Sequence, residues 1–302
     1  MGADVIVLAG GTGGAKLARG MLDVVGDELT VLANTADDIE IYGAYVSPDP
    51  DLCTFWLADR IDERGWGLRD DTFAVMDGLR ELGVEVWLAL GDRDLAIGIE
   101  RARRLGDGAR LTEALAELTA ALGIGARVLP MSDAPVRTWI RTSDAWTPFQ
   151  EFMIKARGAG PVQDVQLRGI ETATAPPEAL DAIASARAIV IGPSNPIISI
   201  GPILAVQGMR DALIDSPAPV VAVSPIVGGA VLKGPTEPFM QWAGHSLDAD
   251  GIAACYAGLL DGLVADEPAD ELPFLRTSTL MSDAASRRRV ASETLAFAEA
   301  FA

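Results

Sequence analysis

Histidine and cysteine are nearly absent from this 302-residue sequence, and both absences exclude chemistry. His245 is the only histidine, so zinc sites with two or three histidines are impossible. A serine or cysteine triad would have to use His245, which stands in a Gly-His-Ser segment with no nucleophile motif nearby. The two cysteines, Cys53 and Cys255, lie far apart in apolar neighbourhoods, which fits reduced, buried thiols better than a disulfide. The chemistry of the chain must therefore rest on carboxylates, backbone amides, arginine, lysine or a metal.

Positive charge and long apolar runs are also scarce. The sequence has 24 lysines and arginines against 43 aspartates and glutamates, a formal net charge of −19, which disfavours nucleic acids and anionic membranes as partners. No run of eighteen apolar residues is present, so we expect no membrane span. The first residues lack the basic and apolar regions of a secretory signal, so we expect a cytoplasmic protein. Any anionic ligand then needs local help from amides, a few basic residues or a metal.

What is present is a globular composition, with 49% apolar and 22% charged residues, in which short apolar runs alternate with helical patterns. This alternation predicts an α/β fold, a Rossmann-like doubly wound and mostly parallel sheet, built from residues 1–136 and 172–302. Residues 137–171 read as a smaller inserted α+β region, and 284–302 as a closing helix. The expected strands are 5–9, 29–33, 86–90, 128–129, 138–140, 188–191 and 220–223. The expected helices are 15–25, 72–82, 95–105, 111–122, 177–186, 203–214 and 249–260.

The first expected strand ends in the glycine-rich segment Gly10-Gly11-Thr12-Gly13-Gly14-Ala15-Lys16. Glycines let a backbone approach a phosphate closely, and a helix that starts after them presents free N–H groups and partial positive charge. The segment departs from both common nucleotide templates, since the third glycine of the dinucleotide fingerprint would fall on Lys16 and no Gly-Lys-Ser/Thr follows. We therefore predict a phosphate or nucleotide loop, without support for NAD.

Acidic residues gather after the second expected strand. Asn34-Thr35-Ala36-Asp37-Asp38 follows it, and Ser47-Pro48-Asp49-Pro50-Asp51 comes soon after, with no lysine or arginine between positions 20 and 59. Crowded carboxylates repel one another, and Mg²⁺ relieves this repulsion while binding one or two carboxylates together with substrate phosphates. A solvated acidic loop explains the charge equally well.

Two further loops follow expected strands. Gly91-Asp92-Arg93-Asp94 is a candidate substrate clamp, although one of its aspartates is expected to cap the next helix. The other is a pair of proline-rigidified turns, Gly192-Pro193-Ser194-Asn195-Pro196 and Ser224-Pro225-Ile226-Val227-Gly228, whose neutral donors suit a diphosphate or a base, or which are simply rigid. Since ligands of such sheets collect at the carboxyl ends of the strands, the loops together favour a phosphate-bearing ligand with a cation.

These loops belong to a longer ordered set of motifs that covers nearly the whole chain. Its further members are Arg64-Gly65-Trp66-Gly67, Leu129-Pro130-Met131-Ser132-Asp133, Ser199-Ile200-Gly201-Pro202-Ile203 and Thr279-Leu280-Met281. The set resembles that of the 2-phospho-L-lactate transferase family of coenzyme F420 biosynthesis. In that family a phospholactyl, phosphoenolpyruvyl or phosphoglyceryl group passes from a guanosine diphosphate-linked donor to a hydroxyl of the deazaflavin Fo, with Mg²⁺ assisting and GMP leaving.

The resemblance implies roles for individual residues and a homodimer. Asp38 and Asp49 would hold Mg²⁺ with Asp37 beside them, and Asp51, Asp92 and Arg93 would face the Fo hydroxyl and the transferred phosphate. The donor nucleotide would contact Gly10, Gly11, Thr12, Gly13, Gly14, Lys16, Asn34, Gly91, Ser194, Asn195, Pro196, Ser224 and Gly228. One departure is Leu52, where the family pattern has a threonine; Thr54 is a possible replacement. A non-catalytic nucleotide-sugar-binding regulator of similar fold stays open as an alternative, and an NAD-dependent dehydrogenase is disfavoured.

Overall fold

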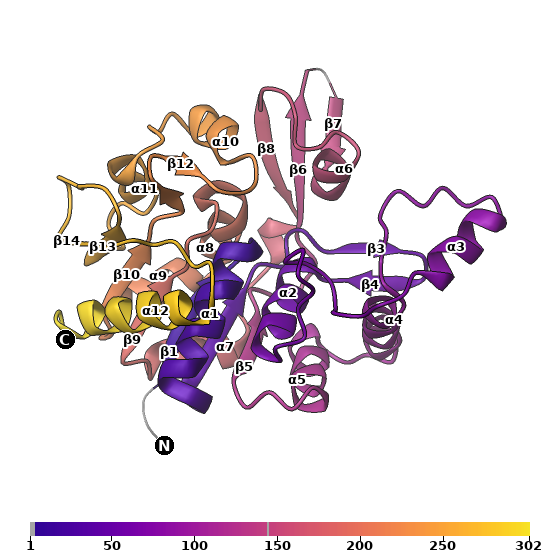
Figure 1. Cartoon of the computed structure of the whole chain (residues 1–302), viewed down its shortest axis with the longest axis horizontal. Coiled ribbons are helices and arrows are strands. Elements are labelled where there is room, and N and C mark those ends of the chain that lie inside the picture. The colour runs from indigo at the N-terminus through magenta and orange to yellow at the C-terminus, as the bar shows by residue number, and fades with distance from the viewer. Residues whose placement is uncertain (1–3, 144) are drawn as a thin grey trace.

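The computed structural model describes residues 4–143 and 145–302. Its centre is a parallel sheet of seven strands in the order β14-β13-β10-β9-β1-β2-β5 (Figure 1). The strands are β1 Val5–Ala9, β2 Leu29–Ala33, β5 Arg127–Pro130, β9 Ala188–Ile191, β10 Val220–Val223, β13 Gly262–Ala265 and β14 Phe274–Arg276. The predicted α/β fold with a parallel sheet is confirmed.

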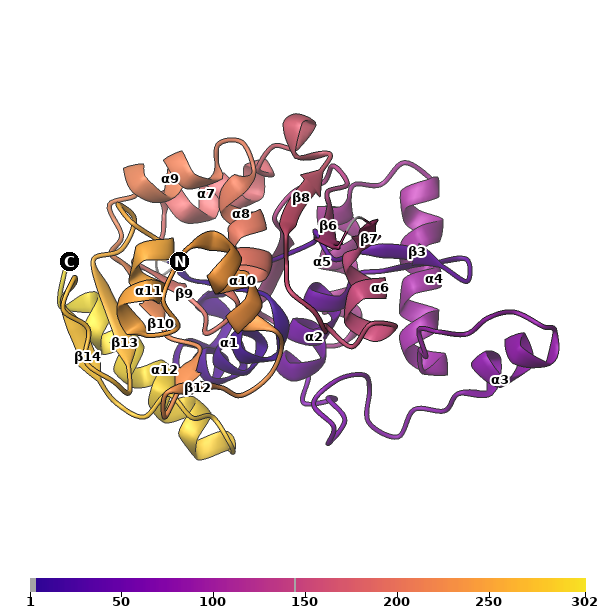
Figure 2. The ribbon, with the colours of Figure 1, turned by 90° about the horizontal axis from the view of Figure 1, so that it is seen from above.

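Helices cover both faces of this sheet. Alternate residues of β1 point to opposite sides, so that Val5 and Val7 belong to one core cluster and Ile6 and Leu8 to the other. The first cluster is completed by α1 (Gly11–Val25), α2 (Pro48–Leu57) and α12 (Ala284–Glu299). The second is completed by α7 (Pro177–Ala184), α8 (Gly201–Ala205), α9 (Met209–Asp215), α10 (Thr236–Ala243) and α11 (Ala249–Cys255). Figure 2 shows α7 and α9 on one side of the strands and α12 on the other.

The strand order reverses beside β1. From β1 the chain moves outward through β2 to β5, and it later returns to the opposite neighbour of β1, strand β9. The connections that leave β1 and β9 therefore diverge to opposite faces, which opens a crevice at the carboxyl ends of these two strands. The crevice is where a sheet of this type holds its ligand.

Two smaller regions extend from the sheet. A three-stranded antiparallel sheet, β6 (Arg137–Thr142), β7 (Ala145–Pro148) and β8 (Asp164–Arg168), with helix α6 (Phe149–Ile154), lies within the range 137–171 (Figure 1). The hairpin β3 (Ile39–Ile41) and β4 (Ala44–Val46) packs with α3 (Ala74–Glu81), α4 (Asp92–Gly106) and α5 (Leu111–Ala121). The remaining elements are β11 Ile226–Val227, β12 Ala230–Val231, the 3-10 turns η1 Gly26–Glu28 and η2 Ile170–Thr172, and the π-helical turn η3 Pro196–Ile200. The proposed domain boundaries stay a prediction.

Several predicted elements differ in the structure. The predicted strand at 86–90 is not formed, so this prediction is wrong. The apolar run has no neighbouring strand, and its side chains Val86 and Leu88 pack against the small core of α3 and α4. Helix α1 begins at Gly11 and not at Ala15, so the glycine segment forms its first turn. The helix at 203–214 is two helices, α8 and α9, and residues 138–140 lie in the small antiparallel sheet. No helix in the described part of the chain is both long and apolar enough to cross a bilayer.

Candidate active site

The crevice contains a cleft of about 630 Å³. It is lined by the first turn of α1 with Lys16 and by the adjoining turn after β9 with Pro193, Ser194 and Asn195. Asp37 and Asp49 reach it from the side of β2, and the β11–β12 hairpin reaches it from the side of β10. Residues from both halves of the sequence therefore enclose one space at the carboxyl ends of the strands.

The glycine segment is packed tightly against the chain that follows β9. A Cβ on Gly13 would lie 2.0 Å from the carbonyl oxygen of Pro193, one on Gly14 would lie 2.8 Å from the Ser194 Oγ, and one on Gly10 would lie 2.6 Å from the Ser199 Cβ. Gly11 has no such neighbour, but its φ of +63° is in the left-handed region. Glycine is thus needed here to let the two turns meet, and residues 10–13 also line the cleft.

The aspartates beside the glycine segment form a buried, hydrogen-bonded group. The Asn34 Nδ2 donates to Asp37 Oδ2 at 3.1 Å and to Asp49 Oδ2 at 2.9 Å, and the Gly11 N–H donates to Asp49 Oδ1 at 2.7 Å. Asp38 turns away toward Ser47, whose Oγ donates to its Oδ1 at 2.8 Å. Asp49 therefore links the start of α1 to the end of β2.

Burial changes the acidity of all three carboxyls. It raises the pKa of Asp49 to about 6, against the opposing hydrogen bond from Gly11, and the pKa of Asp38 to about 7, against the positive charge of Arg137. Burial together with the charge of Asp49 raises the pKa of Asp37 well above its usual value. These carboxylates carry an electrostatic strain that a bound cation would relieve.

The donor set fits a magnesium ion that shares its coordination with a ligand. Two buried oxygens, Asp37 Oδ1 and Asp38 Oδ2, have no hydrogen-bond partner. Asp37 and Asp49 line the cleft and Asp38 does not, and within residues 4–143 and 145–302 no three His, Cys, Asp or Glu side chains are grouped closely enough to hold a metal alone. Mg²⁺ commonly uses one or two carboxylates and completes its octahedron with phosphate oxygens and water. Asp37 and Asp49 are the pair placed for this.

Asp51 is engaged in an ion pair beneath the cleft. Arg101 of α4 donates to Asp51 through both terminal nitrogens, and its Nη1 also donates to the Tyr45 carbonyl oxygen at 2.9 Å. Both charged side chains are almost fully buried. Asp51 does not line the cleft, and its contact with Arg101 fastens α4 to the start of α2.

The Gly91-Asp92-Arg93 segment lies at a different contact, between α3 and α4. Asp92 accepts hydrogen bonds from the Thr72 Oγ1 and from the N–H groups of Ala74 and Val75, so it caps α3. Asp71 in turn accepts from the N–H groups of Arg93 and Asp94 and caps α4, so the cap expected on this helix from Asp92 or Asp94 is wrong. Gly91, Asp92 and Arg93 do not line the cleft. Their predicted catalytic role stays a prediction, and the structure gives Asp92 a capping role.

The turns after β9 and β10 reach the cleft with fixed side chains. Asn195 Oδ1 accepts from the N–H groups of Ile197 and Ile198, which fixes the start of η3 at Pro196, and Ser194 Oγ accepts from the Gly10 N–H at 3.4 Å. Ser224 Oγ accepts from the Ile226 N–H, and Gly228 donates its N–H to Asp266. Ser194, Asn195 and Ser224 line the cleft together with Thr12, while Gly14, Asn34, Pro196 and Gly228 do not.

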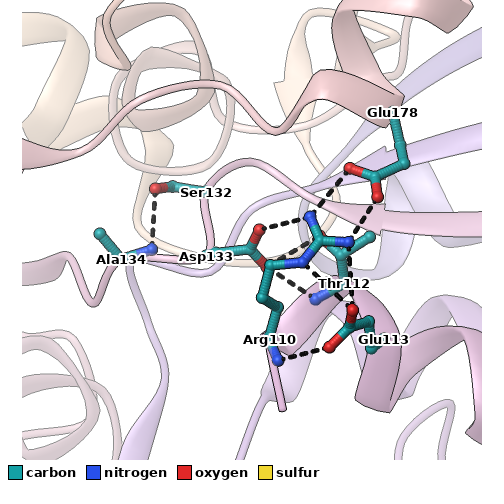
Figure 3. Close-up of polar contacts among 7 residues, drawn as sticks. All are labelled: Arg110, Thr112, Glu113, Ser132, Asp133, Ala134 and Glu178. Atoms are coloured by element: carbon teal, nitrogen blue, oxygen red, sulfur yellow. Dashed lines mark hydrogen bonds and ion pairs between the residues drawn. The ribbon is translucent and has the colours of Figure 1, made fainter. Parts of the chain in front are cut away.

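Asp133, from the Leu129–Asp133 motif, has a structural role. Its Oδ1 accepts from the Thr112 N–H and Oγ1, both at 2.8 Å, and so caps α5 (Figure 3). Arg110 bridges Asp133 to Glu178 of α7. The motif therefore joins α5, β5 and α7 and does not extend into the cleft.

Other cleft residues are not among the predicted site residues. Lys233 and Gln150 line the cleft, and Gln150 Nε2 donates to the Asp37 carbonyl oxygen at 3.1 Å. Thr279 lines it with a buried Oγ1 that has no hydrogen-bond partner, and Trp66 lines it with half of its side chain exposed. Thr279 and Trp66 belong to the motifs found in the sequence, which could have indicated them. Lys233 and Gln150 belong to none of these motifs.

These features define the class of protein, a doubly wound α/β protein with a cleft at the reversal of strand order. The family model "2-phospho-L-lactate transferase CofD" matches residues 5–285. A 2-phospho-L-lactate transferase of Methanosarcina mazei is 43% identical over 90% of this chain and 90% of its own. A phosphoenolpyruvate transferase of Kitasatospora aureofaciens is 38% identical over 98% of each chain. The chain belongs to the 2-phospho-L-lactate transferase family, CofD, and is a transferase.

The fold has a counterpart among solved structures. The crystal structure of protein BH3568 from Bacillus halodurans matches 96% of this chain and 91% of its own, with a TM-score of 0.57 and 17% sequence identity. At this identity the likeness concerns the fold alone.

Proposed function

We propose that this protein transfers a phospholactyl, phosphoenolpyruvyl or phosphoglyceryl group from a guanosine diphosphate-linked donor to the hydroxyl of Fo, releasing GMP, in coenzyme F420 biosynthesis. The observation that supports this most is the cleft itself. It combines the open first turn of α1 with the buried carboxylates Asp37 and Asp49, which suits a diphosphate with a divalent cation.

In this proposal the chain acts by positioning and by charge, since phosphoryl transfer asks little covalent chemistry of side chains. Asp37 and Asp49 would hold Mg²⁺, which would supply positive charge to the phosphate oxygens. The backbone at Gly11 to Gly13 and the Ser194 and Asn195 turn hold the diphosphate in line with the attacking hydroxyl.

The acceptor is proposed to lie toward the outer part of the cleft, against apolar and aromatic side chains. Trp66, Phe149 and Met153 line this space, and Trp66 is braced by Arg64, whose guanidinium lies 4.5 Å from the ring centroid. A flat deazaflavin ring suits such a surface because aromatic stacking is favoured there. We further propose a homodimer in the cytoplasm, which agrees with two free cysteines.

The deciding experiment is product identification. The protein is incubated with Fo, Mg²⁺ and each of the three guanylyl donors, and the products are analysed by mass spectrometry. Formation of GMP together with phospholactyl-, phosphoenolpyruvyl- or phosphoglyceryl-Fo supports the proposal and identifies the donor. Binding of the donor without transfer and without any change in Fo fluorescence would refute it and favour the nucleotide-sugar-binding regulator.

A further inference from the structure

Lysine is rare in this protein, and its placement is uneven. The sequence contains three lysines, Lys16, Lys155 and Lys233, while the other basic side chains apart from His245 are arginines. Lys155 forms an ion pair with Glu151 one helical turn away, at 3.1 Å. The other two lysines both line the cleft. A protein with a net charge of −19 thus places two of its three ammonium groups in one cavity.

Lys16 is held inside the cleft wall by neutral groups. Its Nζ donates to the Met281 carbonyl oxygen at 3.1 Å and lies 5.8 Å from the centroid of the Trp56 ring. Burial, followed by the positive charges of Lys233 and Arg287, lowers the pKa of Lys16. In the part of the chain that the structure describes, no carboxylate forms an ion pair with Lys16.

Lys233 approaches the cleft from its mouth. It follows β12 and precedes Gly234, a left-handed position, and its side chain is exposed. The Nζ donates to the Arg64 carbonyl oxygen at 3.5 Å, next to the loop that carries Trp66. Among the described residues it too has no carboxylate partner within ion-pair distance.

The cleft therefore contains groups of both charges. Asp37 and Asp49 bring carboxylate oxygens to its lining, and Lys16 and Lys233 bring ammonium groups that repel each other. Neutral carbonyl oxygens do not cancel two positive charges, whereas one anion between them would. Lysine suits this task because its flexible stem lets a point charge follow a ligand.

We propose that Lys16 and Lys233 form an anion subsite of the cleft that binds an acidic group of the donor. The subsite rests on the proposed function for the identity of the donor. Its chemistry is that of a phosphate or a carboxylate, and the donor carries both, in its diphosphate and in its acid. The subsite thereby selects acidic donors over neutral ones.

The test is calorimetric binding without acceptor or turnover. Guanosine, GDP, inorganic pyrophosphate and 2-phospho-L-lactate are titrated into the wild-type protein, Lys233→Met and Lys16→Met, each with Mg²⁺. Lys155→Met is the matched control because Lys155 lies outside the cleft. Circular dichroism of each variant confirms folding, and the exposed Lys233 makes its variant the safer of the two.

We expect GDP or 2-phospho-L-lactate to bind about ten-fold more weakly to Lys233→Met, the effect of losing one charged hydrogen bond, with guanosine and the control unchanged. Weakened pyrophosphate and GDP identify the diphosphate as the bound group, and weakened 2-phospho-L-lactate alone identifies the acid carboxylate. Wild-type affinity of folded Lys233→Met and Lys16→Met for all the anions overturns the subsite. Absence of transfer to Fo would refute only the proposed function, since these affinities are measured without it.

Discussion

At the scale of single residues, close packing explains why glycines occupy the first turn of α1. Adding a methyl group to Gly13 places it 2.0 Å from a backbone carbonyl that cannot move without displacing the β9 turn. Gly78 in α3 is the opposite case, since a Cβ there meets nothing within 4 Å. Comparing substitutions at Gly13 and Gly78 therefore separates a steric requirement for glycine from the ordinary effect of glycine on backbone entropy.

We predict that Gly13→Ala lowers the free energy of unfolding by about 1–3 kcal/mol through overpacking and abolishes nucleotide binding. Gly78→Ala, by contrast, should raise it by about 0.5–1 kcal/mol, since alanine loses less backbone entropy in a helix. Urea unfolding followed by circular dichroism measures both. If Gly13→Ala left the free energy of unfolding unchanged, the two turns would be less closely packed than they are in the structure.

The buried aspartates predict a pH dependence of stability. The pKa of Asp38 rises from 3.8 to about 7 on folding, so the native state binds more protons than the unfolded state between these values. Stability in EDTA should consequently fall as the pH rises from about 4 to about 7. At about 1.4 kcal/mol per pKa unit, the upper limit for Asp38 is about 4 kcal/mol.

Asp38→Asn should flatten this dependence and be more stable than the wild type above pH 7, because the amide keeps an acceptor for Ser47 without a buried charge. Urea unfolding at pH 4 to 8 provides the measurement, with the exposed Asp211→Asn as the control. An unchanged slope in Asp38→Asn would contradict the prediction. In the same variant, unchanged transfer activity across a Mg²⁺ titration would remove Asp38 from the cation site.

At the scale of elements, the Asp51–Arg101 pair joins α2 and α4, which are not consecutive helices of the chain. Arg101→Met leaves Asp51 as a buried carboxylate without its cation, for which we predict a loss of about 3–5 kcal/mol. The double variant with Asp51→Asn should recover part of that loss, because the stranded charge is gone. Chemical unfolding of both single variants and the double variant gives the coupling energy, and purely additive effects would disprove the pairing.

Elements also show what the sequence could and could not predict. Strands such as Val5–Ala9 were predictable because a doubly buried parallel strand is apolar at every position, although the equally buried β13 was not among the expected strands. The run at 86–90 has the same local pattern but no strand lies beside it. An apolar run therefore forms a strand only where another strand can pair with it. Asp37 and Asp49 could be predicted by position after a strand and by family resemblance. The capping role of Asp92 could not be predicted, because the groups that it caps lie at the start of α3, about twenty residues earlier in the chain.

At the scale of the whole molecule, the cleft is closed by two halves of the chain. Gly11, Lys16 and Asp49 come from the first fifth, and Ser194, Lys233 and Thr279 from the last third or so. The C-terminal helix α12 lies alongside α1 on the same face of the sheet, so that the ends of the chain share one core (Figure 1). A ligand in the cleft contacts both halves and binds only when they are assembled.

Ligand binding should therefore stabilise the whole fold. With GDP and Mg²⁺ at one hundred times the dissociation constant, we predict that the free energy of unfolding rises by about 2.7 kcal/mol, because the unfolded chain has no cleft to bind them. Differential scanning calorimetry measures the shift, with guanosine plus Mg²⁺ and GDP plus EDTA as controls. The shift should shrink in EDTA, since the ion that offsets the charge of Asp37 and Asp49 is then absent. If millimolar GDP with Mg²⁺ leaves the transition in place, the cleft does not bind a guanosine diphosphate and the proposed donor class is wrong.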